Sequence, residues 1–253
     1  MKNSETLQTY DLSLLNRSRE KWRSSASLRA VYADIFAEVR RHLVPGGILE
    51  IGSGIGVTRD YLPGVTTSDI VATEFVDLAV SAYAIPERDW NNLIAIDMLH
   101  HLQEPLRFLE SAAKALAPGG RIVLVEPAGT WWGCHFYRWF HHEPCRPKDV
   151  QSPFSFTADP DGGFANMGIA HALFSQQREA IAAELKSRHQ LNLISVRYRD
   201  FFAYPATGGF SRNALFPAGI IRALLALERV APQFVMQRLG LRMVVVLEKD
   251  HAV

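Results

Sequence analysis

Residues 48–56, which read ILEIGSGIG, constrain the fold of this chain more than any other stretch. A short apolar run ends beside Glu50 and is followed by three glycines, Gly52, Gly54 and Gly56. Such a run is typical of a buried strand, and glycines directly after it allow a tight turn and bring the backbone close to a ligand. Because α/β sheets bind nucleotide-like cofactors where a strand turns into a helix, we predict a cofactor site at this turn.

Segments with strand-like and helix-like patterns alternate on both sides of the turn. Apolar side chains at three- and four-residue spacing predict helices at residues 25–44, 104–116, 170–186 and 218–230. Apolar or β-branched runs predict strands at residues 48–51, 65–70, 76–80, 93–96, 121–125, 191–202 and 243–247. This alternation predicts a doubly wound α/β fold, in which helices cover both faces of a parallel sheet.

The composition indicates a folded chain without a strongly charged partner. Of the 253 residues, 48% are hydrophobic and 21% are charged, and the formal net charge is +1. These values predict a full core and give no electrostatic reason to expect nucleic acid or an anionic membrane as partner. Two cysteines suit a reducing compartment. The chain shows neither a signal-type apolar segment nor a run of about 20 apolar residues. We therefore expect a cytoplasmic protein that makes no stable membrane insertion.

The spacing of the glycines distinguishes between two nucleotide-like cofactors. A dinucleotide fingerprint is G-x-G-x-x-G, whereas the three glycines here follow G-x-G-x-G. Glu50 would repel a pyrophosphate at close range, and it suits a cationic ligand such as the ammonium group of S-adenosylmethionine (SAM). We therefore expect SAM to be bound by Glu50 and by the turn, which includes Ser53. We expect Asp69, at the end of the second strand, to accept hydrogen bonds from the ribose diol.

Three motifs together resemble those of class I SAM-dependent methyltransferases of the bacterial type-11-like kind. Residues 50–56 (EIGSGIG) look like the first motif of this family. Residues 98–102 (MLHHL) resemble the end of its fourth strand, and residues 116–121 (LAPGGR) resemble the turn into its fifth. The resemblance implies a Rossmann-like, seven-stranded and mostly parallel sheet, which residues 243–247 close in an antiparallel hairpin.

The same resemblance sets the expected domain boundaries. Residues 45–253 form the methyltransferase domain, with an insertion over about residues 130–190, after the fifth strand, that forms a cap. Residues 1–44 are an N-terminal helical lead, and the first 24 of them either stay flexible or fold over the site.

The resemblance also assigns further residues to the cofactor pocket. In many relatives an aspartate after the third strand binds the adenine amino group, and Ser81 stands at that place, followed by Ala82. Either Ser81 takes this role more weakly, or backbone groups of Ala82 and Tyr83 replace it. Asp97 and Met98 are expected to line the pocket where the fourth strand ends, with a helix N-cap as the alternative role of Asp97.

Two pairs of adjacent histidines are the candidates for acid–base chemistry. His100 and His101 follow the fourth strand, and His141 and His142 follow the aromatic segment 131–140. Methyl transfer to an oxygen requires a base, and an imidazole can serve as one at neutral pH. The spacing of these histidines matches no standard zinc pattern, so no metal is expected.

The acceptor is expected to be a small molecule bound beneath the cap. Aromatic residues that follow the fifth strand lie near the carboxyl ends of the strands, where ligands bind. The candidate contacts are Trp131, Trp132, Tyr137 and Tyr204. We expect an O-methyltransferase of secondary metabolism or glycan biosynthesis. Nitrogen, carbon and lipid-linked acceptors stay open, as do a SAM-binding protein without catalysis and the oligomeric state.

Overall fold

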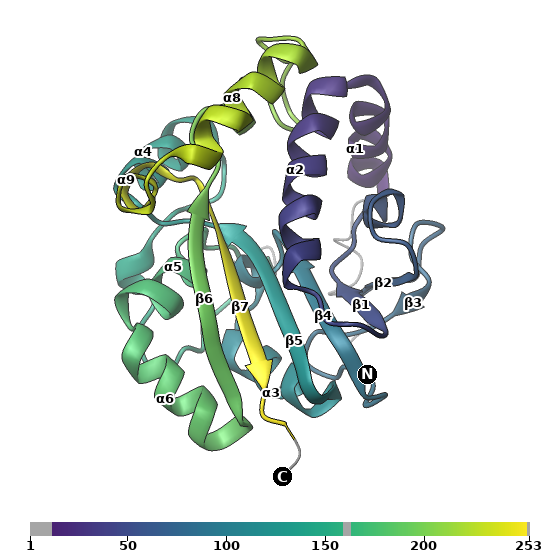
Figure 1. Cartoon of the computed structure of the whole chain (residues 1–253), viewed down its shortest axis with the longest axis vertical. Coiled ribbons are helices and arrows are strands. Elements are labelled where there is room, and N and C mark those ends of the chain that lie inside the picture. The colour runs from purple at the N-terminus through teal and green to yellow at the C-terminus, as the bar shows by residue number, and fades with distance from the viewer. Residues whose placement is uncertain (1–11, 159–162, 252–253) are drawn as a thin grey trace.

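The centre of the computed structural model, which describes residues 12–158 and 163–251, is a seven-stranded sheet (Figure 1). The strands lie in the order β3-β2-β1-β4-β5-β7-β6. Strands β1 to β5 run parallel, and β7 is antiparallel to both β5 and β6. Their bounds are β1 Ile48–Ile51, β2 Val65–Asp69, β3 Leu78–Ala79, β4 Trp90–Ile96, β5 Leu116–Pro127, β6 Leu191–Arg199 and β7 Arg242–Lys249. The predicted fold class, including the antiparallel closing strand, is confirmed.

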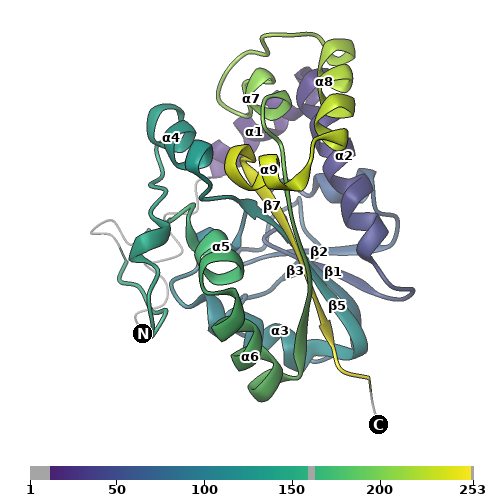
Figure 2. The same cartoon turned by 60° about the vertical axis from the view of Figure 1, so that its left-hand side comes forward.

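Side chains of alternate residues in the central strands belong to two separate hydrophobic cores, one on each face of the sheet. In β4, Leu93 and Ala95 belong to one core and Ile94 to the other. The first core includes side chains of α3 (Pro105–Ala115) and α6 (Arg178–His189). The second includes those of α2 (Ala26–His42) and α8 (Ala218–Val230) (Figures 1 and 2). Because successive side chains of a strand point to opposite faces, the central strands provide an apolar surface for a helical layer on each face.

Helix α2 begins where its sequence predicts. The hydroxyl oxygen of Ser25 accepts a hydrogen bond from the Leu28 amide at 3.2 Å, which satisfies one of the free amides of the first turn. Arg40, Arg41 and His42 lie in the last turn, where positive charge suits the helix dipole.

Helix α1 (Leu12–Ser24) packs against α2 and lies beside the turn that follows β1. Trp22 of α1 is buried, with its ring centroid 5.4 Å from that of Tyr32 and 6.1 Å from that of Tyr61. The end of the lead is therefore helical and docked, whereas residues 1–11 lie outside the described residues.

Several connections gather at the carboxyl ends of the parallel strands. The 3-10 turn η2 (Leu99–His101) follows β4, α4 (Trp131–Phe140) follows β5, and α7 (Ala203–Ala206) follows β6. Helix α9 (Gln233–Leu239) leads into β7 and contacts α4 (Figure 2). Because open α/β sheets bind ligands outside the carboxyl ends of their strands, the candidate site lies at this end.

Two predicted elements differ from the structure. The strand predicted over residues 76–80 is reduced to Leu78–Ala79. Just before it, the Asp77 amide donates to the Thr67 carbonyl, and the Asp77 carboxylate accepts hydrogen bonds from the amide and hydroxyl of Thr67. The helix predicted over residues 170–186 is divided into α5 (Ile169–His171), a π-helical turn (Ala172–Gln176) and α6. In the π-helical turn the Gln177 amide bonds to the Ala172 carbonyl, which interrupts the regular helix.

The predicted cap over about residues 130–190 includes α6, which packs on the sheet. Ile181 and Leu185 of α6 belong to the core beneath the sheet, so α6 covers the sheet beside α3 and does not cover the site. The sheet needs this helix because β5 and β6 would otherwise expose the apolar side chains on that face. The part of the insertion that can shape the site therefore ends before α6.

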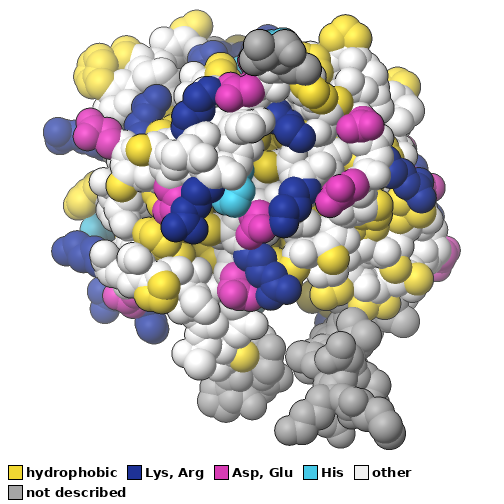
Figure 3. Space-filling view, turned by 90° about the horizontal axis from the view of Figure 1, so that it is seen from below, with side chains coloured by type: hydrophobic (Ala, Val, Ile, Leu, Met, Phe, Trp, Pro, Cys, Tyr) yellow, Lys and Arg dark blue, Asp and Glu magenta, His cyan; other side chains and the backbone are white. Residues whose placement is uncertain are grey.

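The surface carries mixed charge. On the face shown in Figure 3, Lys and Arg side chains lie among Asp and Glu side chains, in keeping with the formal net charge of +1. Among the helices that the structure describes, none has both the length and the apolar composition needed to cross a membrane.

A chain of ion pairs joins the end of β4 to β7, β6 and α2. Arg242 of β7 binds the Asp97 carboxylate through Nη2 at 2.5 Å and Nε at 3.3 Å. The Nη1 atom of Arg242 lies 3.8 Å from Oδ2 of Asp200. Arg199 then connects Asp200, at 3.1 Å, to Asp34 of α2, at 2.6 Å. Since Arg242 and Asp200 are buried, their charges depend on one another for compensation.

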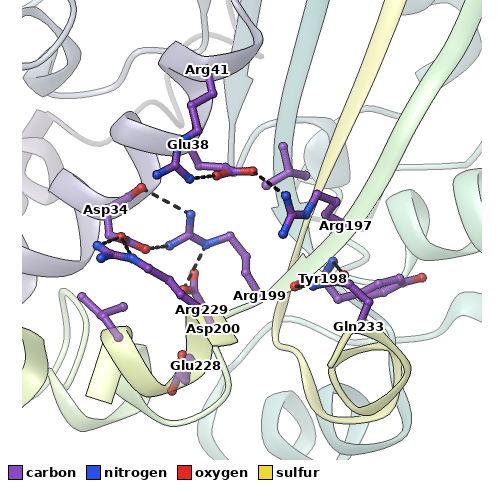
Figure 4. Close-up of a pocket in the computed structure, with 12 residues that line it drawn as sticks. Asp34, Glu38, Arg41, Arg197, Tyr198, Arg199, Asp200, Glu228, Arg229 and Gln233 are labelled. Atoms are coloured by element: carbon purple, nitrogen blue, oxygen red, sulfur yellow. Dashed lines mark hydrogen bonds and ion pairs between the residues drawn. The ribbon is translucent and has the colours of Figure 1, made fainter. Parts of the chain in front are cut away.

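The ion pairs at the Asp34 end of this series surround a cavity of about 240 Å³ (Figure 4). Asp34 accepts hydrogen bonds there from Arg199 and from Nε of Arg229, the latter at 2.7 Å. The lining comes from α2, β6 and α8 with neighbouring residues, and the glycine turn does not contribute to it. The cavity therefore belongs to the ion pairs that hold α2 and α8 on the sheet, and we do not place the cofactor there.

Replacing Arg242 should destabilise the fold far more than replacing Arg229. We expect Arg242→Met to lower the free energy of unfolding by about 3–5 kcal/mol, because Asp97 and Asp200 lose their shared cation. Arg229 is 56% exposed, so Arg229→Met should cost at most about 1 kcal/mol. Urea unfolding of both variants measures the difference, and equal midpoints would contradict the role given to Arg242.

Candidate functional site

The turn after β1 is closed by backbone and carboxylate contacts to β2. The Ser53 amide donates to the Ser68 carbonyl at 2.8 Å, and the Ser53 hydroxyl oxygen accepts from the Ser68 amide at 3.0 Å. The Gly54 amide donates to Oδ2 of Asp69 at 2.8 Å. Gly54 has φ +52°, and a Cβ atom built on it would meet nothing within 4 Å. The turn therefore leaves open space where a ligand can approach the backbone.

Glu50 lies beneath this turn and carries an unpaired buried oxygen. The Thr58 hydroxyl donates to Oε1 of Glu50 at 2.6 Å, whereas Oε2 is buried without a hydrogen-bond partner. Burial raises the pKa of Glu50 to about 6. A cationic or hydrogen-bond-donating ligand group would compensate this oxygen. The residues at the turn thus fit the ammonium-bearing cofactor that the sequence predicts.

The other predicted cofactor contacts lie at neighbouring strand ends. The Val80 amide donates to the Asp69 carbonyl at 2.8 Å, which brings Ser81 and Ala82 beside the end of β2. The Ser81 hydroxyl accepts from the Tyr83 amide at 3.2 Å. The Asp97 carboxylate is held by Arg242 and by the Tyr32 hydroxyl, which donates at 3.3 Å.

Met98 joins the glycine turn to the end of β4. A Cβ atom added at Gly52 would lie 2.5 Å from Cγ of Met98, so the turn and this side chain are in direct contact. His100 and His101 follow Met98 within three residues, so the first histidine pair comes directly after the residue that contacts the glycine turn.

Glu126, at the end of β5, holds the turn η2 in place. Its fully buried carboxylate accepts hydrogen bonds from the amides of Met98, Leu99 and His100, at 2.8, 2.7 and 3.4 Å. It also contacts Nδ1 of His100 at 2.8 Å. A buried carboxylate is stable with this many donors, and the His100 ring is fixed by the same contacts.

All four predicted histidines converge on Glu143, and we call these five residues the Glu143 cluster. The Glu143 carboxylate lies 3.6 Å from His100, 3.8 Å from His101 and 3.7 Å from both His141 and His142, measured to the nearest ring nitrogens. Two histidine pairs that are 40 positions apart in the sequence therefore meet at one carboxylate.

The histidines of the Glu143 cluster differ in protonation. Burial alone would lower the pKa of His100, but the carboxylates of Glu126 and Glu143 outweigh it and raise the pKa to about 10. Burial and the charge of His100 lower the pKa of His101, and burial lowers that of His141. Burial would raise the pKa of Glu143, but its histidine partners lower it to about 2. At neutral pH the cluster thus contains an imidazolium at His100 and neutral imidazoles at His101 and His141.

The aromatic residues proposed for substrate contact have different surroundings. Trp131 is 65% exposed, whereas Trp132 keeps a buried indole N–H without a hydrogen-bond partner. Tyr137 is buried, and its hydroxyl donates to the Leu241 carbonyl. The ring of Tyr204 lies under the Arg242 guanidinium, 4.0 Å from its carbon to the ring centroid.

Thr130 sets the position of α4 within this arrangement. Its hydroxyl oxygen accepts from the Gly133 amide at 2.9 Å as the helix N-cap and donates to the Gly240 carbonyl at 2.8 Å. The start of α4 is therefore fixed against the segment that enters β7.

Sequence reasoning missed Glu126 and Arg242, and it named Glu143 only as a neighbour of the histidines. An acid at the end of an apolar strand, such as Glu126 after residues 121–125, is the signal that could have identified the first. For Arg242 and Glu143 no local signal exists, because their partners lie in distant segments.

A comparison with protein families identifies the class of reaction that this chain catalyses. Residues 22–159, more than half of the chain, match the model of a family described as a methyltransferase domain. The chain belongs to this family. It is a class I SAM-dependent methyltransferase, and SAM is its cofactor. No curated protein matches the sequence.

Solved structures share the fold of this methyltransferase at low sequence identity. A SAM-dependent methyltransferase from Archaeoglobus fulgidus is 11% identical, with 94% of this chain and 100% of that chain covered and a TM-score of 0.51. The 1,6-didemethyltoxoflavin-N1-methyltransferase of Burkholderia thailandensis, solved with 1,6-didemethyltoxoflavin and S-adenosylhomocysteine, is 13% identical. That comparison covers 97% of this chain and 88% of the other, with a TM-score of 0.49.

Alanine at Gly54 should impair SAM binding, whereas alanine at Gly64 should not. Gly54 and Gly64 have φ +52° and +79°, and added Cβ atoms meet nothing within 4 Å at either position. Each variant should therefore lose a similar amount of stability, about 1–2 kcal/mol. Only Gly54→Ala fills the space at the cofactor turn, so its dissociation constant for SAM should rise at least about tenfold. Calorimetric titration tests this, and equal SAM affinity of the two variants would contradict it.

Glu50 should give the apo protein a characteristic pH dependence. Because burial raises its pKa to about 6 from 4.5, the native state binds more protons than the unfolded state between these values. The stability that protonated Glu50 contributes is therefore lost as the pH rises through 6. Relative to Glu50→Gln, the wild type should lose about 2 kcal/mol of unfolding free energy between pH 4.5 and 7. Urea unfolding across this range measures the difference, and parallel curves would refute the assignment.

Proposed function

We propose that this methyltransferase methylates a hydroxyl oxygen of a small molecule and that the hydroxyl loses its proton at the Glu143 cluster. The observation that carries the proposal is the convergence of four histidines on Glu143, next to a cofactor turn that touches Met98. Methyl transfer to nitrogen or carbon can proceed without a base, whereas a neutral alcohol needs one. A site with two neutral imidazoles, those of His101 and His141, therefore supports an oxygen acceptor.

The chemistry divides between the cofactor and the chain. SAM supplies a methyl group on a sulfonium, and the sulfur–carbon bond breaks with its electron pair remaining on sulfur as S-adenosylhomocysteine. The acceptor oxygen forms the new carbon–oxygen bond and gives up its proton. His101 and His141, whose pKa values are lowered, can take that proton at neutral pH. His100, with a pKa of about 10, keeps its own proton in the apo protein and is unsuited to this role.

The acceptor pocket is proposed to lie between α4 and α7. Trp132, with its unpaired indole N–H, and Tyr204, stacked on Arg242, are the side chains proposed to contact the acceptor. Trp131 is proposed as a contact at the rim, since it is largely exposed. We keep the sequence-based proposals of a cytoplasmic location and of a role in secondary metabolism or glycan biosynthesis.

Transfer of a labelled methyl group to a panel of hydroxyl, amine and lipid-linked acceptors tests the proposal. We expect product on a hydroxyl acceptor, and we expect His101→Ala and Glu143→Gln to lower kcat by about 10²-fold or more. Calorimetry should show SAM affinity within about twofold of wild type for both variants, because neither residue belongs to the glycine turn. His189, the last residue of α6, precedes the amino end of β6 and not the carboxyl ends where the cluster lies, so His189→Ala is the matched control.

Three outcomes would reject this function. Full turnover of His101→Ala, Glu143→Gln, His141→Ala and His142→Ala would exclude proton removal at the cluster. Product only on amines would exclude an oxygen acceptor. SAM binding without product on any acceptor would instead indicate a binding protein.

A further inference from the structure

Two rings of the Glu143 cluster present the same nitrogen to the same carboxylate. Nε2 of His100 lies 3.6 Å from Oε2 of Glu143, and Nε2 of His101 lies 3.8 Å from Oε1. The three potential ligand atoms all lie within 4.8 Å of one another. Separations of 3.6 and 3.8 Å are too long for good hydrogen bonds. They are close to the separation of about 3.4 Å between two ligands that each bind a tetrahedral Zn²⁺ at 2.0–2.1 Å.

The opposite nitrogen of each ring is held by an acceptor. Nδ1 of His100 lies 2.8 Å from the Glu126 carboxylate, and Nδ1 of His101 lies 3.4 Å from the Phe164 carbonyl. Both acceptors favour a proton on Nδ1. When each ring is neutral, as His100 becomes on exchanging its second proton for a metal ion, its lone pair therefore lies on Nε2 and faces Glu143. Metal-binding histidines show this arrangement, in which a carboxylate or carbonyl orients the ring through its other nitrogen.

The charge around these atoms also favours a cation. Glu126 is fully buried and Glu143 is 16% exposed, so two carboxylates flank His100 in a region with little water. A positive partner stabilises such a pair of one buried and one partly buried carboxylate. A proton on His100 supplies one charge, and a divalent ion in its place would supply two.

We propose that His100, His101 and Glu143 bind a divalent transition-metal ion, with Zn²⁺ the best fit. Two imidazoles and one carboxylate form the three-ligand set of catalytic zinc sites, which leave a fourth position open. Mg²⁺ fits less well because it prefers oxygen ligands in octahedral geometry. His101 is 46% exposed, so the ion can enter from solvent while His100 and Glu126 form the buried side of the site.

The metal site gives a second way to remove the proton from the acceptor, and this role rests on the proposed function. A hydroxyl bound at the open position would have a lowered pKa, so a weak base such as His141 or solvent would suffice. The site itself depends only on the residues of the chain. Metal binding and methyl transfer can therefore fail independently.

Sequence reasoning predicted no metal because it searched for local spacing. His100 and His101 lie next to one another, and Glu143 is 42 positions further along the chain. Adjacent residues on a regular helix or strand diverge, but the 3-10 turn η2 brings their rings to within 4.1 Å of each other, measured between centroids. The three ligands come together only because the segment after α4 brings Glu143 next to this turn.

Metal titration of the apo protein tests the site. The protein is treated with a chelator and then titrated with ZnCl₂, CoCl₂ or MgCl₂ in a non-thiol reductant, with calorimetry and with Co²⁺ absorption as readouts. We expect one equivalent of Zn²⁺ and of Co²⁺, visible Co²⁺ bands of a four-coordinate ion, and no comparable binding of Mg²⁺. His101→Ala and Glu143→Gln should each weaken Zn²⁺ binding by about 100-fold or more, because each removes one of three protein ligands.

Two controls separate this site from other metal ligands. His189→Ala should bind Zn²⁺ as the wild type does. Cys134 and Cys145, whose sulfur atoms lie 3.2 Å apart, are the two thiols of the sequence, so the double variant Cys134→Ser, Cys145→Ser should also keep full affinity.

The outcomes distinguish the two proposals. Loss of binding in the cysteine variant with retention in His101→Ala, or no stoichiometric binding at all, would overturn the metal site. If the chelated protein methylates a hydroxyl at full rate and binds no metal, the metal site fails and the proposed function stands. If Zn²⁺ binds as expected and only amines are methylated, the proposed function fails and the metal site stands.

Discussion

The buried carboxylate of Glu126 is the interaction on which the site depends. It accepts hydrogen bonds from three backbone amides that follow β4 and contacts the His100 ring. These contacts hold the residues after the strand in a 3-10 turn. A buried carboxylate with fewer donors would be costly. The requirement to satisfy Glu126 therefore also fixes the directions in which His100 and His101 point.

The rest of the site is built around this turn by contacts between distant segments. Met98 packs on Gly52 and thereby joins the cofactor turn to the histidines. On the other side, Asp97 is held by Arg242, which connects the end of β4 to β7. The parallel strands supply adjacent carboxyl ends, and buried polar contacts determine which side chains meet there. One consequence is that the glycine turn and the Glu143 cluster are linked through Met98 and the turn η2.

The outcomes for individual elements show how far sequence patterns extend. The apolar stripe of α2 and its Ser25 cap are local properties, and both appear as predicted. The third strand and the helix over residues 170–186 were predicted by similar patterns, but the strand is only two residues long and a π-helical turn divides the helix. The cap over about residues 130–190 stays a prediction, because nothing local distinguishes α6, which packs on the sheet, from a helix that covers the site.

The sequence by itself determined the fold class, the glycine turn and the identity of the histidines, because strand period, backbone freedom and residue type are local quantities. It did not determine their partners. Only the tertiary structure brought His100 and His101 to Glu143 and placed Glu126 behind them. The physical reason is that pKa values and ligand geometry depend on the distances between charges, which long-range packing sets.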